Sequence, residues 1–448
     1  MIKNVLFIFT PIFIYLVLSS FIENTQDLIL ITLILSTIIF WATNVVPLYF
    51  SSLIFLFVPI VFSISSKEVV FSGFSSSAFW LVFAGMLIAT AVKNVQLNDR
   101  FSLIFANIRN LTYLKLLIYI SIFSVLFSFI MPSSVVRIVL LVPLAVVVAT
   151  NLGFSENDKG YIGIMLTFIL SSTLPAFTVL TANVPNMILA GLTKEVFDYE
   201  ILFSQYFISN FLVLGLLKNI VIVSLIYYFF NDTPKKQITI EKSKAYSKDE
   251  KIVLAVILVM LTFWMSDFMH KISPSIIAIV GVLFLAYPSI NIIKSKDINT
   301  INFSSLIYVA AIISLGSLVA SNSYIKTTLF EAINQFEPFE YELFNYMALT
   351  SIMSFSGIVI TQPTIPAIFT PLAEQLSQIS GFSLDEIFMM QVAAFSNVFF
   401  PFQAPPLIVG LALSQIKQKY MLKIILFLAL ISIVFLYPLE YLWLTLLR

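Results

Sequence analysis

Residues 127–145 read FSFIMPSSVVRIVLLVPLA, and residues 355–373 read FSGIVITQPTIPAIFTPLA. The two stretches align without a gap at an offset of 228 residues, with Phe-Ser at the start and Pro-Leu-Ala at the end of both. Gly-Phe-Ser at 153–155 and at 381–383 extends the match at the same offset. Each stretch has Pro and polar residues in the middle of an apolar run, where they interrupt a helix. The sequence therefore predicts an internal repeat with an interrupted hairpin in each half.

The composition indicates that these stretches belong to a membrane protein. Of the 448 residues, 60% are hydrophobic and 10% are charged, whereas soluble domains contain about 25% charged residues. At about 20 residues per span, the chain has room for roughly ten to twelve transmembrane segments. A net charge of +1 gives no basic surface for nucleic acid. The absence of Cys and the single His exclude a disulfide framework, a His-built zinc site and a Ser-His-Asp triad, so we do not expect an enzyme.

The predicted fold is an all-α polytopic membrane protein with about 11 transmembrane helices and two re-entrant hairpins, at about 111–150 and 341–377. Lys and Arg are retained on the cytoplasmic side of membranes. The Lys-rich stretch 231–251 is therefore expected inside, and the four Glu between residues 331 and 342 outside. This topology puts the N-terminus in the cytoplasm and the C-terminus outside, and the two hairpins open to opposite sides. Inverted repeats with interrupted helices are typical of secondary transporters.

The spans are expected to form six regions along the chain. Residues 1–72 and 252–300 would be scaffold helices, 201–251 a scaffold helix with the cytoplasmic linker, and 414–448 the last scaffold helix. Residues 73–200 would be the first repeat, with the cytoplasm-facing hairpin and a broken helix. Residues 301–413 would be the second repeat, with the outward-facing hairpin and a second broken helix.

Four helix breaks contain the polar residues expected to bind the solute. The free N–H groups at the start of a half-helix attract an anion, and the free carbonyls at the end of one attract a cation. The first hairpin tip and the third break would form one half-site, and the second tip and the fourth break the other. The candidate substrate-binding residues are Ser133, Ser134, Arg137, Asn183, Pro185, Asn186, Thr361, Gln362, Thr364, Gln403 and Pro405.

At these breaks the sequence resembles the divalent anion/sodium symporter family from about residue 70 onward. In that family each tip contains Ser-Asn-Thr with a Pro ten residues after the Ser, and here Ser133 and Thr361 stand ten residues before Pro143 and Pro371. The resemblance implies a scaffold domain for dimerisation, a transport domain that moves like an elevator, and Na⁺ coupling with no organic cofactor. The residues it implies for Na⁺ are Ser133, Ser134, Ala182, Thr361 and Gln362. Both tip Asn residues of the family are missing, which weakens this assignment.

Arg137 is the most unusual residue of the first tip, because a charge at this depth costs about 2.5–3.5 kcal/mol on insertion scales. It is expected either to clamp a carboxylate or sulfate, to replace a lost cation as a fixed positive charge, or to serve structure by bonding to free carbonyls. Lys218, in the middle of a span, is expected to have a structural role, either pairing with a carboxylate or capping a dimer interface. Asp267 and His270 are expected at the outer interface.

These features predict a secondary transporter of a small anionic solute, such as a dicarboxylate or sulfate, in a bacterial inner membrane. Its expected partners are the solute, the lipid bilayer and a second copy of the chain. Na⁺-independent exchange and proton coupling are the alternatives for its energetics. A membrane glycan polymerase or ligase is the alternative from another class of protein, but it would need a large extramembrane loop with charged catalytic groups.

Overall fold

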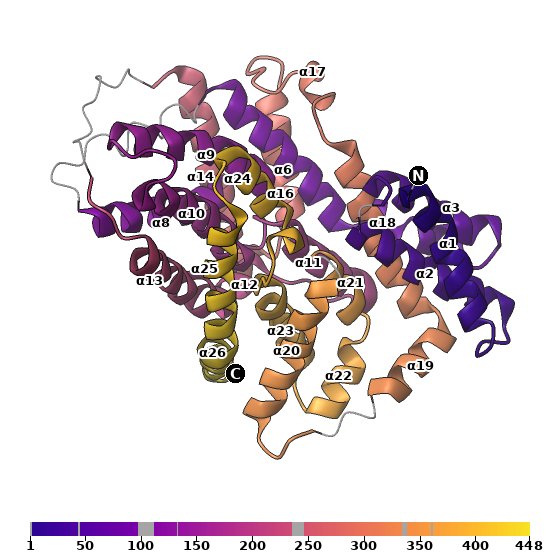
Figure 1. The fold of residues 1–448 in the computed structure, drawn as a ribbon. Coiled ribbons are helices and arrows are strands. Elements are labelled where there is room, and N and C mark those ends of the chain that lie inside the picture. Colours follow the sequence, from indigo (N-terminus) through magenta and orange to yellow (C-terminus); the bar gives the residue numbers. More distant parts are fainter. Residues whose placement is uncertain are drawn as a thin grey trace. The chain divides into compact units, whose positions relative to one another are not determined.

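The computed structural model describes residues 2–43, 45–96, 112–131, 133–234, 246–333, 338–359 and 362–448. Helices connected by short turns make up these ranges, and none of the residues in them forms a strand (Figure 1). The chain divides into two compact units, each built from three stretches of sequence. Unit 1 contains Met1–Trp80, Met187–Ile201 and Asn302–Phe395, and unit 2 contains Leu81–Asn186, Leu202–Ile301 and Ser396–Arg448.

Unit 1 is organised around α18, which packs against α3 and α5. The approach to α5 is close, because the Gly73 amide donates a hydrogen bond to Ser314 Oγ at 3.2 Å. A Cβ on Gly73 would lie 1.9 Å from the Ala310 carbonyl oxygen, so only glycine fits there. The helices of this unit are α1 (Ile2–Leu18), α2 (Thr25–Thr43), α3 (Leu48–Val61), α4 (Lys67–Val70), α5 (Ser72–Ser75), the start of α6 (Ser77–Asn94), most of α11 (Val184–Phe197), α18 (Phe303–Ser321), α19 (Ser323–Ile333), α20 (Glu342–Val359), α21 (Thr364–Phe369), α22 (Ala373–Ser380) and most of α23 (Leu384–Ser396).

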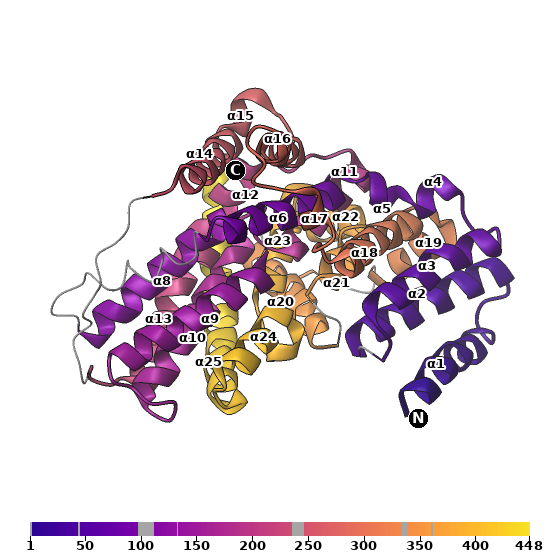
Figure 2. The ribbon, with the colours of Figure 1, turned by 90° about the horizontal axis from the view of Figure 1, so that it is seen from above.

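Unit 2 is organised around α10, in which every residue after Lys159 is buried. Helices α8, α9, α13 and α24 pack against it (Figure 2). The helices of this unit are most of α6 (Ser77–Asn94), α8 (Tyr113–Ile130), α9 (Ser134–Asn151), α10 (Lys159–Thr173), the start of α11 (Val184–Phe197), α12 (Phe203–Asn210), α13 (Lys218–Phe230), α14 (Lys248–Met265), α15 (Asp267–His270), α16 (Pro274–Ala286), α17 (Ser295–Ile298), α24 (Pro405–Ser414), α25 (Gln418–Ile431) and α26 (Tyr437–Leu447). Two π-helical segments, Phe211–Leu217 and Ser432–Leu436, join α12 to α13 and α25 to α26.

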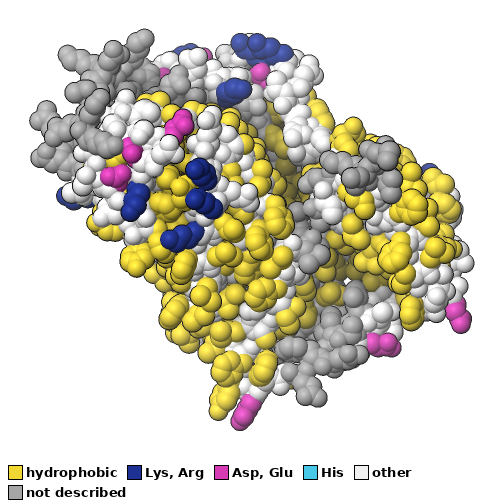
Figure 3. Space-filling view, in the orientation of Figure 1, with side chains coloured by type: hydrophobic (Ala, Val, Ile, Leu, Met, Phe, Trp, Pro, Cys, Tyr) yellow, Lys and Arg dark blue, Asp and Glu magenta, His cyan; other side chains and the backbone are white. Residues whose placement is uncertain are grey.

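The helices have the length and apolarity of membrane spans, which confirms a polytopic all-α membrane protein. Seven helical stretches in the described ranges are long and apolar enough to cross a membrane, with mean hydropathies of 1.4 to 2.5, and five shorter helices are also apolar. Hydrophobic side chains cover most of the face seen in Figure 3, and charged side chains occur there only in small groups. The total of about 11 spans, the six regions and the opposite orientation of the hairpins stay predictions.

The element order of the first half recurs in the second half. Helix α6 is followed by α8 and α9, and α18 is followed by α20 and by α21 with α22. The starts of the matching helices are 226 to 230 residues apart, close to the offset of the sequence match. The two predicted hairpins thus correspond to α8–α9 and to α20–α22. The second one differs because its returning helix ends at Phe369 and restarts at Ala373, next to Pro371.

Candidate functional site

The first hairpin tip is a short turn between two helix ends. Helix α8 ends at Ile130 with Met131 as its C-cap, and Ser133 is the N-cap of α9. The Ser133 hydroxyl accepts a hydrogen bond from the Val136 amide at 3.5 Å, which satisfies one of the free N–H groups at the start of the helix. Ser133 and Ser134 are both half-buried. The tip therefore presents hydroxyls at the positive end of an 18-residue helix.

Arg137 lies one turn into α9, and its side chain is 0% exposed. Its Nη1 donates to the Met131 carbonyl at 2.6 Å and to the Ala182 carbonyl at 2.8 Å. Its Nε donates to the Ser172 carbonyl at 3.2 Å, and its Nη2 donates to Asn183 Oδ1 at 2.9 Å. A guanidinium has five N–H donors, so these four bonds leave one Nη2–H for another partner. Protein oxygens alone thus satisfy most of this buried cation.

The four acceptors of Arg137 come from places where helices end. Met131 caps α8, Ser172 lies in the last turn of α10, and Ala182 and Asn183 lie in the break before α11. Carbonyls at helix C-termini lack intrahelical donors and have the partial negative charge of the helix dipole. The Met131 and Ser172 carbonyls are of this kind. With the Ala182 carbonyl and Asn183 Oδ1 from the break before α11, they make an oxygen cage suited to a cation. The guanidinium occupies that cage.

Two asparagines hold the third break in its irregular course between α10 and α11. The Asn183 amide donates to the Thr173 carbonyl at 3.4 Å, and the Asn186 amide donates to the Val179 carbonyl at 2.8 Å and the Ala176 carbonyl at 3.3 Å. Pro185, the second residue of α11, is buried beside them. Among the described residues, the buried Asn186 Oδ1 has no hydrogen-bond partner. The break therefore keeps a polar atom free for a ligand.

The fourth break is also polar and buried. Gln403 is 0% exposed, and its Oε1 accepts hydrogen bonds from the amides of Phe399 at 2.8 Å and Phe400 at 2.7 Å. Within the described ranges, Gln403 Nε2 and both amide atoms of Asn397 have no hydrogen-bond partner. Pro405 is exposed at the start of α24, which packs against α9 and α10. The helix that follows Gln403 thus lies against the first hairpin, whereas the sequence analysis grouped Gln403 with the second tip.

The second tip belongs to unit 1 and is held by its own contacts. The Gln362 amide donates to the Phe395 carbonyl at 2.5 Å, in the last turn of α23. Gln362 and Thr364 are 2% and 1% exposed, and Thr364 begins α21. Thr361 lies outside the described residues. Seven predicted residues thus belong to the first tip and the third break, while Gln362 and Thr364 belong to a separate tip; the seven are Ser133, Ser134, Arg137, Ala182, Asn183, Pro185 and Asn186.

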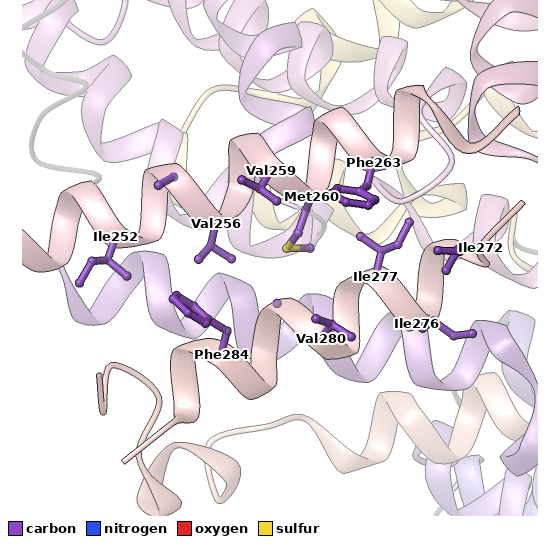
Figure 4. A pocket seen from close by; sticks show the side chains of 12 residues that line it. Ile252, Val256, Val259, Met260, Phe263, Ile272, Ile276, Ile277, Val280 and Phe284 are labelled. Atoms are coloured by element: carbon purple, nitrogen blue, oxygen red, sulfur yellow. The ribbon is translucent and has the colours of Figure 1, made fainter. Parts of the chain in front are cut away.

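A wide apolar groove between α14 and α16 is not a solute site. Its volume is about 590 Å³, and apolar side chains such as Val256, Met260, Phe263, Val280 and Phe284 line it (Figure 4). It offers no side-chain hydrogen-bond donor for an anion, so it suits a lipid chain. Elsewhere in the described part of the chain, no three His, Asp or Glu residues gather to hold a metal ion. A coupling cation would therefore bind hydroxyl, amide and carbonyl oxygens.

Two acidic residues in the described ranges are fully buried, and the sequence analysis singled out only the first of them. Asp267 is 0% exposed, and its carboxylate accepts hydrogen bonds from the Phe203 amide and from the amide and hydroxyl of Ser204 at the start of α12. Glu440 in α26 is also 0% exposed. A lone acidic residue inside a 30-residue apolar stretch was the signal that could have identified Glu440.

Comparison with known proteins gives one family and a distant relative. The family described as "Sodium:sulfate symporter transmembrane region" matches residues 1–448. A protein from Cupriavidus necator, named only "Membrane protein", is 22% identical over 267 residues. The match covers 56% of this chain and 51% of the relative, so the chain spans about half the length of that protein.

Proposed function

We propose, from the premise that this chain belongs to the sodium:sulfate symporter family, that it transports a small anion through the first hairpin tip with Arg137 as a fixed internal cation. The family match confirms the resemblance inferred from the hairpin tips, and it favours secondary anion transport over a membrane glycan polymerase. The observation that supports the role of Arg137 is its cage of four oxygens from Met131, Ser172, Ala182 and Asn183.

The cage supports a cation-replacing role for Arg137 better than a clamp on the solute. A bidentate clamp needs two parallel N–H groups directed at the anion, and only one Nη2–H is free of protein acceptors. The resemblance implies a Na⁺ at this tip, held partly by Ser133, Ser134 and Ala182. In our proposal the guanidinium contributes the positive charge there permanently. Transport then needs no Na⁺ at the first tip.

The anion in this proposal is bound by neutral donors rather than by a charged clamp. These donors lie at the start of α9 and the start of α11, where the helix dipoles favour a negative charge. They belong to Ser133, Ser134, Asn183 and Asn186. Pro185 shapes this half-site. The proposed second half-site consists of Thr361, Gln362, Thr364, Gln403 and Pro405. Thr361 and Gln362 would also hold any coupling Na⁺ at the second tip.

The remaining features of the proposal rest on the family. They are an elevator-like movement of a transport domain, a homodimer, residence in a bacterial inner membrane, and coupling to Na⁺ at the second tip or to a proton. A carboxylate- or sulfate-type anion is the expected solute.

Counterflow in proteoliposomes tests this function. Labelled sulfate, succinate and aspartate are each offered outside vesicles loaded with the same unlabelled solute, in Na⁺ and in choline buffer. We expect one anion to exchange, because alternating access permits exchange without a driving gradient. Failure of all three anions to exchange with protein-specific kinetics would argue against the proposal. An absolute Na⁺ requirement that maps to Ser133 or Ala182 would refute the role of Arg137.

A further inference from the structure

Glu440 has an unusual environment for a buried carboxylate. It lies in α26, the last part of the rod formed by α25 and α26 (Figure 1), and it is 0% exposed. Neither carboxylate oxygen has a hydrogen-bond partner among the described residues. An ionised carboxylate without hydrogen bonds costs several kcal/mol to bury, whereas the neutral acid costs much less. The site therefore favours a bound proton unless a positive charge compensates.

Lys218 is a buried positive charge close enough to Glu440 for the two charges to influence each other. It is the first residue of α13 and 0% exposed, and it follows the segment Phe211–Leu217 against which α26 packs. Its ammonium nevertheless donates its hydrogen bonds elsewhere, to the Ser396 carbonyl at 2.6 Å and to Ser396 Oγ at 3.2 Å. Lys218 thus has two competing partners, one carboxylate and one helix end.

The other partner of Lys218 belongs to the fourth break. Ser396 is the last residue of α23, and an ammonium there offsets the negative end of the helix dipole. The next residue is Asn397, whose buried amide lacks a partner in the described structure, and Gln403 lies in the same break. Lys218 therefore connects the charge state of Glu440 to the start of a break that we assign to solute binding.

Both charged residues follow π-helical segments. Phe211–Leu217 ends directly before Lys218, and Ser432–Leu436 ends four residues before Glu440. The two segments pack against each other, and α26 also packs against Phe211–Leu217 and α12. Single π-helical turns are rare overall, but those that exist are often found at functional sites. They redirect side chains and weaken the local hydrogen bonds of the helix. Their coincidence here supports a site that changes its conformation.

Other titratable groups near the pair are already engaged or distant. From α12, Tyr206 donates to the Phe177 carbonyl at 2.8 Å, and the two π-helical segments contain no titratable residue. Tyr437 and Tyr441 flank Glu440 on its own helix. The helices packed on α13 contribute Tyr113, Lys115, Tyr119, Lys159, Tyr161, Lys419, Tyr420 and Lys423. Of these, Tyr420 and Lys423 contact Phe230 and Phe229, at the far end of α13 from Lys218.

We propose that Glu440 is a proton-binding site that controls the fourth break through Lys218. When Glu440 takes a proton from water, one O–H bond forms, its negative charge is lost, and Lys218 holds the end of α23 at Ser396. When the proton returns to water, the carboxylate draws Lys218 away and loosens the break. The inference rests on the proposed function for its role in transport, where it makes the proton the coupling ion.

Infrared titration of the protein in lipid nanodiscs tests proton binding without a solute. We expect a carbonyl band of a protonated carboxylic acid that grows as the pH is lowered, disappears in Glu440→Gln and changes frequency in Glu440→Asp. Asp267→Asn is the matched control, because Asp267 is a buried carboxylate with three hydrogen-bond donors, and it should leave the band unchanged. A titrating band that is identical in wild type, Glu440→Gln and Glu440→Asp would overturn the proposal.

Hydrogen exchange tests the link to the fourth break. Glu440→Gln mimics the protonated state at every pH. At alkaline pH the backbone amides of residues 397–404 should therefore exchange hydrogen about tenfold faster in wild type than in the variant. At acid pH the two proteins should exchange equally fast. Equal exchange at every pH would refute the link. In the counterflow vesicles, an acid exterior should accelerate uptake by wild type and not by Glu440→Gln. Uptake that does not change with pH would refute proton coupling. Absence of any exchange would count against the proposed function, and the infrared and hydrogen-exchange experiments would still decide whether Glu440 binds a proton and controls the fourth break.

Discussion

Replacing Arg137 by Ala should convert the oxygen cage into a Na⁺ site. The substitution leaves four buried acceptors without a donor: the carbonyls of Met131, Ser172 and Ala182, and Asn183 Oδ1. A buried acceptor without a partner costs about 1–3 kcal/mol, so the loss is about 4–12 kcal/mol before relaxation. Because a folded domain is stable by only about 5–15 kcal/mol, the variant should be severely destabilised in the absence of a replacement cation.

Thermal unfolding in nanodiscs measures this effect. A sodium ion that fits the cage should recover part of the loss, about 2.7 kcal/mol if its concentration is 100 times its Kd. The apparent melting temperature of Arg137→Ala should therefore be higher in NaCl than in choline chloride at equal ionic strength, and this difference should be larger than in wild type. Arg137→Lys should lie between the two, because an ammonium has three donors rather than five.

Two outcomes would refute this reasoning. The first is an Arg137→Ala protein that melts at the wild-type temperature, which would mean that the four hydrogen bonds contribute nothing. The second is a destabilised variant that NaCl and choline chloride affect equally, which would mean that the cage does not select a cation. Val139→Ala is the matched control, since Val139 lies on the same helix with its side chain 46% exposed.

Three further predictions concern other parts of the molecule. Gly73→Ala should destabilise unit 1 by about 1–3 kcal/mol in thermal unfolding, because the new Cβ would meet the Ala310 carbonyl; an unchanged melting temperature would contradict this packing. Asp267→Ala should lower the free energy of unfolding by about 2–4 kcal/mol, because it removes a carboxylate that accepts three hydrogen bonds at the start of α12. Proteolysis of α12 in detergent should be faster in the variant, and equal cleavage rates in variant and wild type would refute the capping role. The chain has no Cys, so single cysteines can be introduced at Ser155 and Ser383, which are matched in the repeat. An impermeant maleimide should label position 155 from the cytoplasmic side and position 383 from the outer side. Labelling of both positions from the same side would refute inverted hairpins.

The sequence predicted the places of the breaks because local chemistry determines them. Pro and the short polar residues end helices wherever they occur in an apolar run, and helices do end at Ile130, Thr173, Val359 and Ser396. The additional interruption between Phe369 and Ala373 was not predicted, although Pro371 marks it.

The partners of the buried charges could not be predicted in the same way. Ser172 and Asn183 lie 35 and 46 residues from Arg137, and Ser396 lies 178 residues from Lys218. Such contacts depend on how helices pack, and no local pattern contains that information. The expectation that Lys218 pairs with a carboxylate stays a prediction, since neither Glu440 oxygen has a hydrogen-bond partner among the described residues. The hydrogen bonds of Lys218 to a helix end appear only in the structure.

The burial of α10 from Gly160 to Thr173 has a consequence for biosynthesis. Helix α10 leaves the ribosome early, but α24, which packs against it, ends at Ser414. At about 5–20 residues per second, synthesis of the intervening chain takes on the order of 10–50 s. Throughout that interval Ser171, Ser172 and Thr173 have no covering helix on one side. The nascent protein therefore needs the insertion machinery or a chaperone beside α10 until its own C-terminal half arrives.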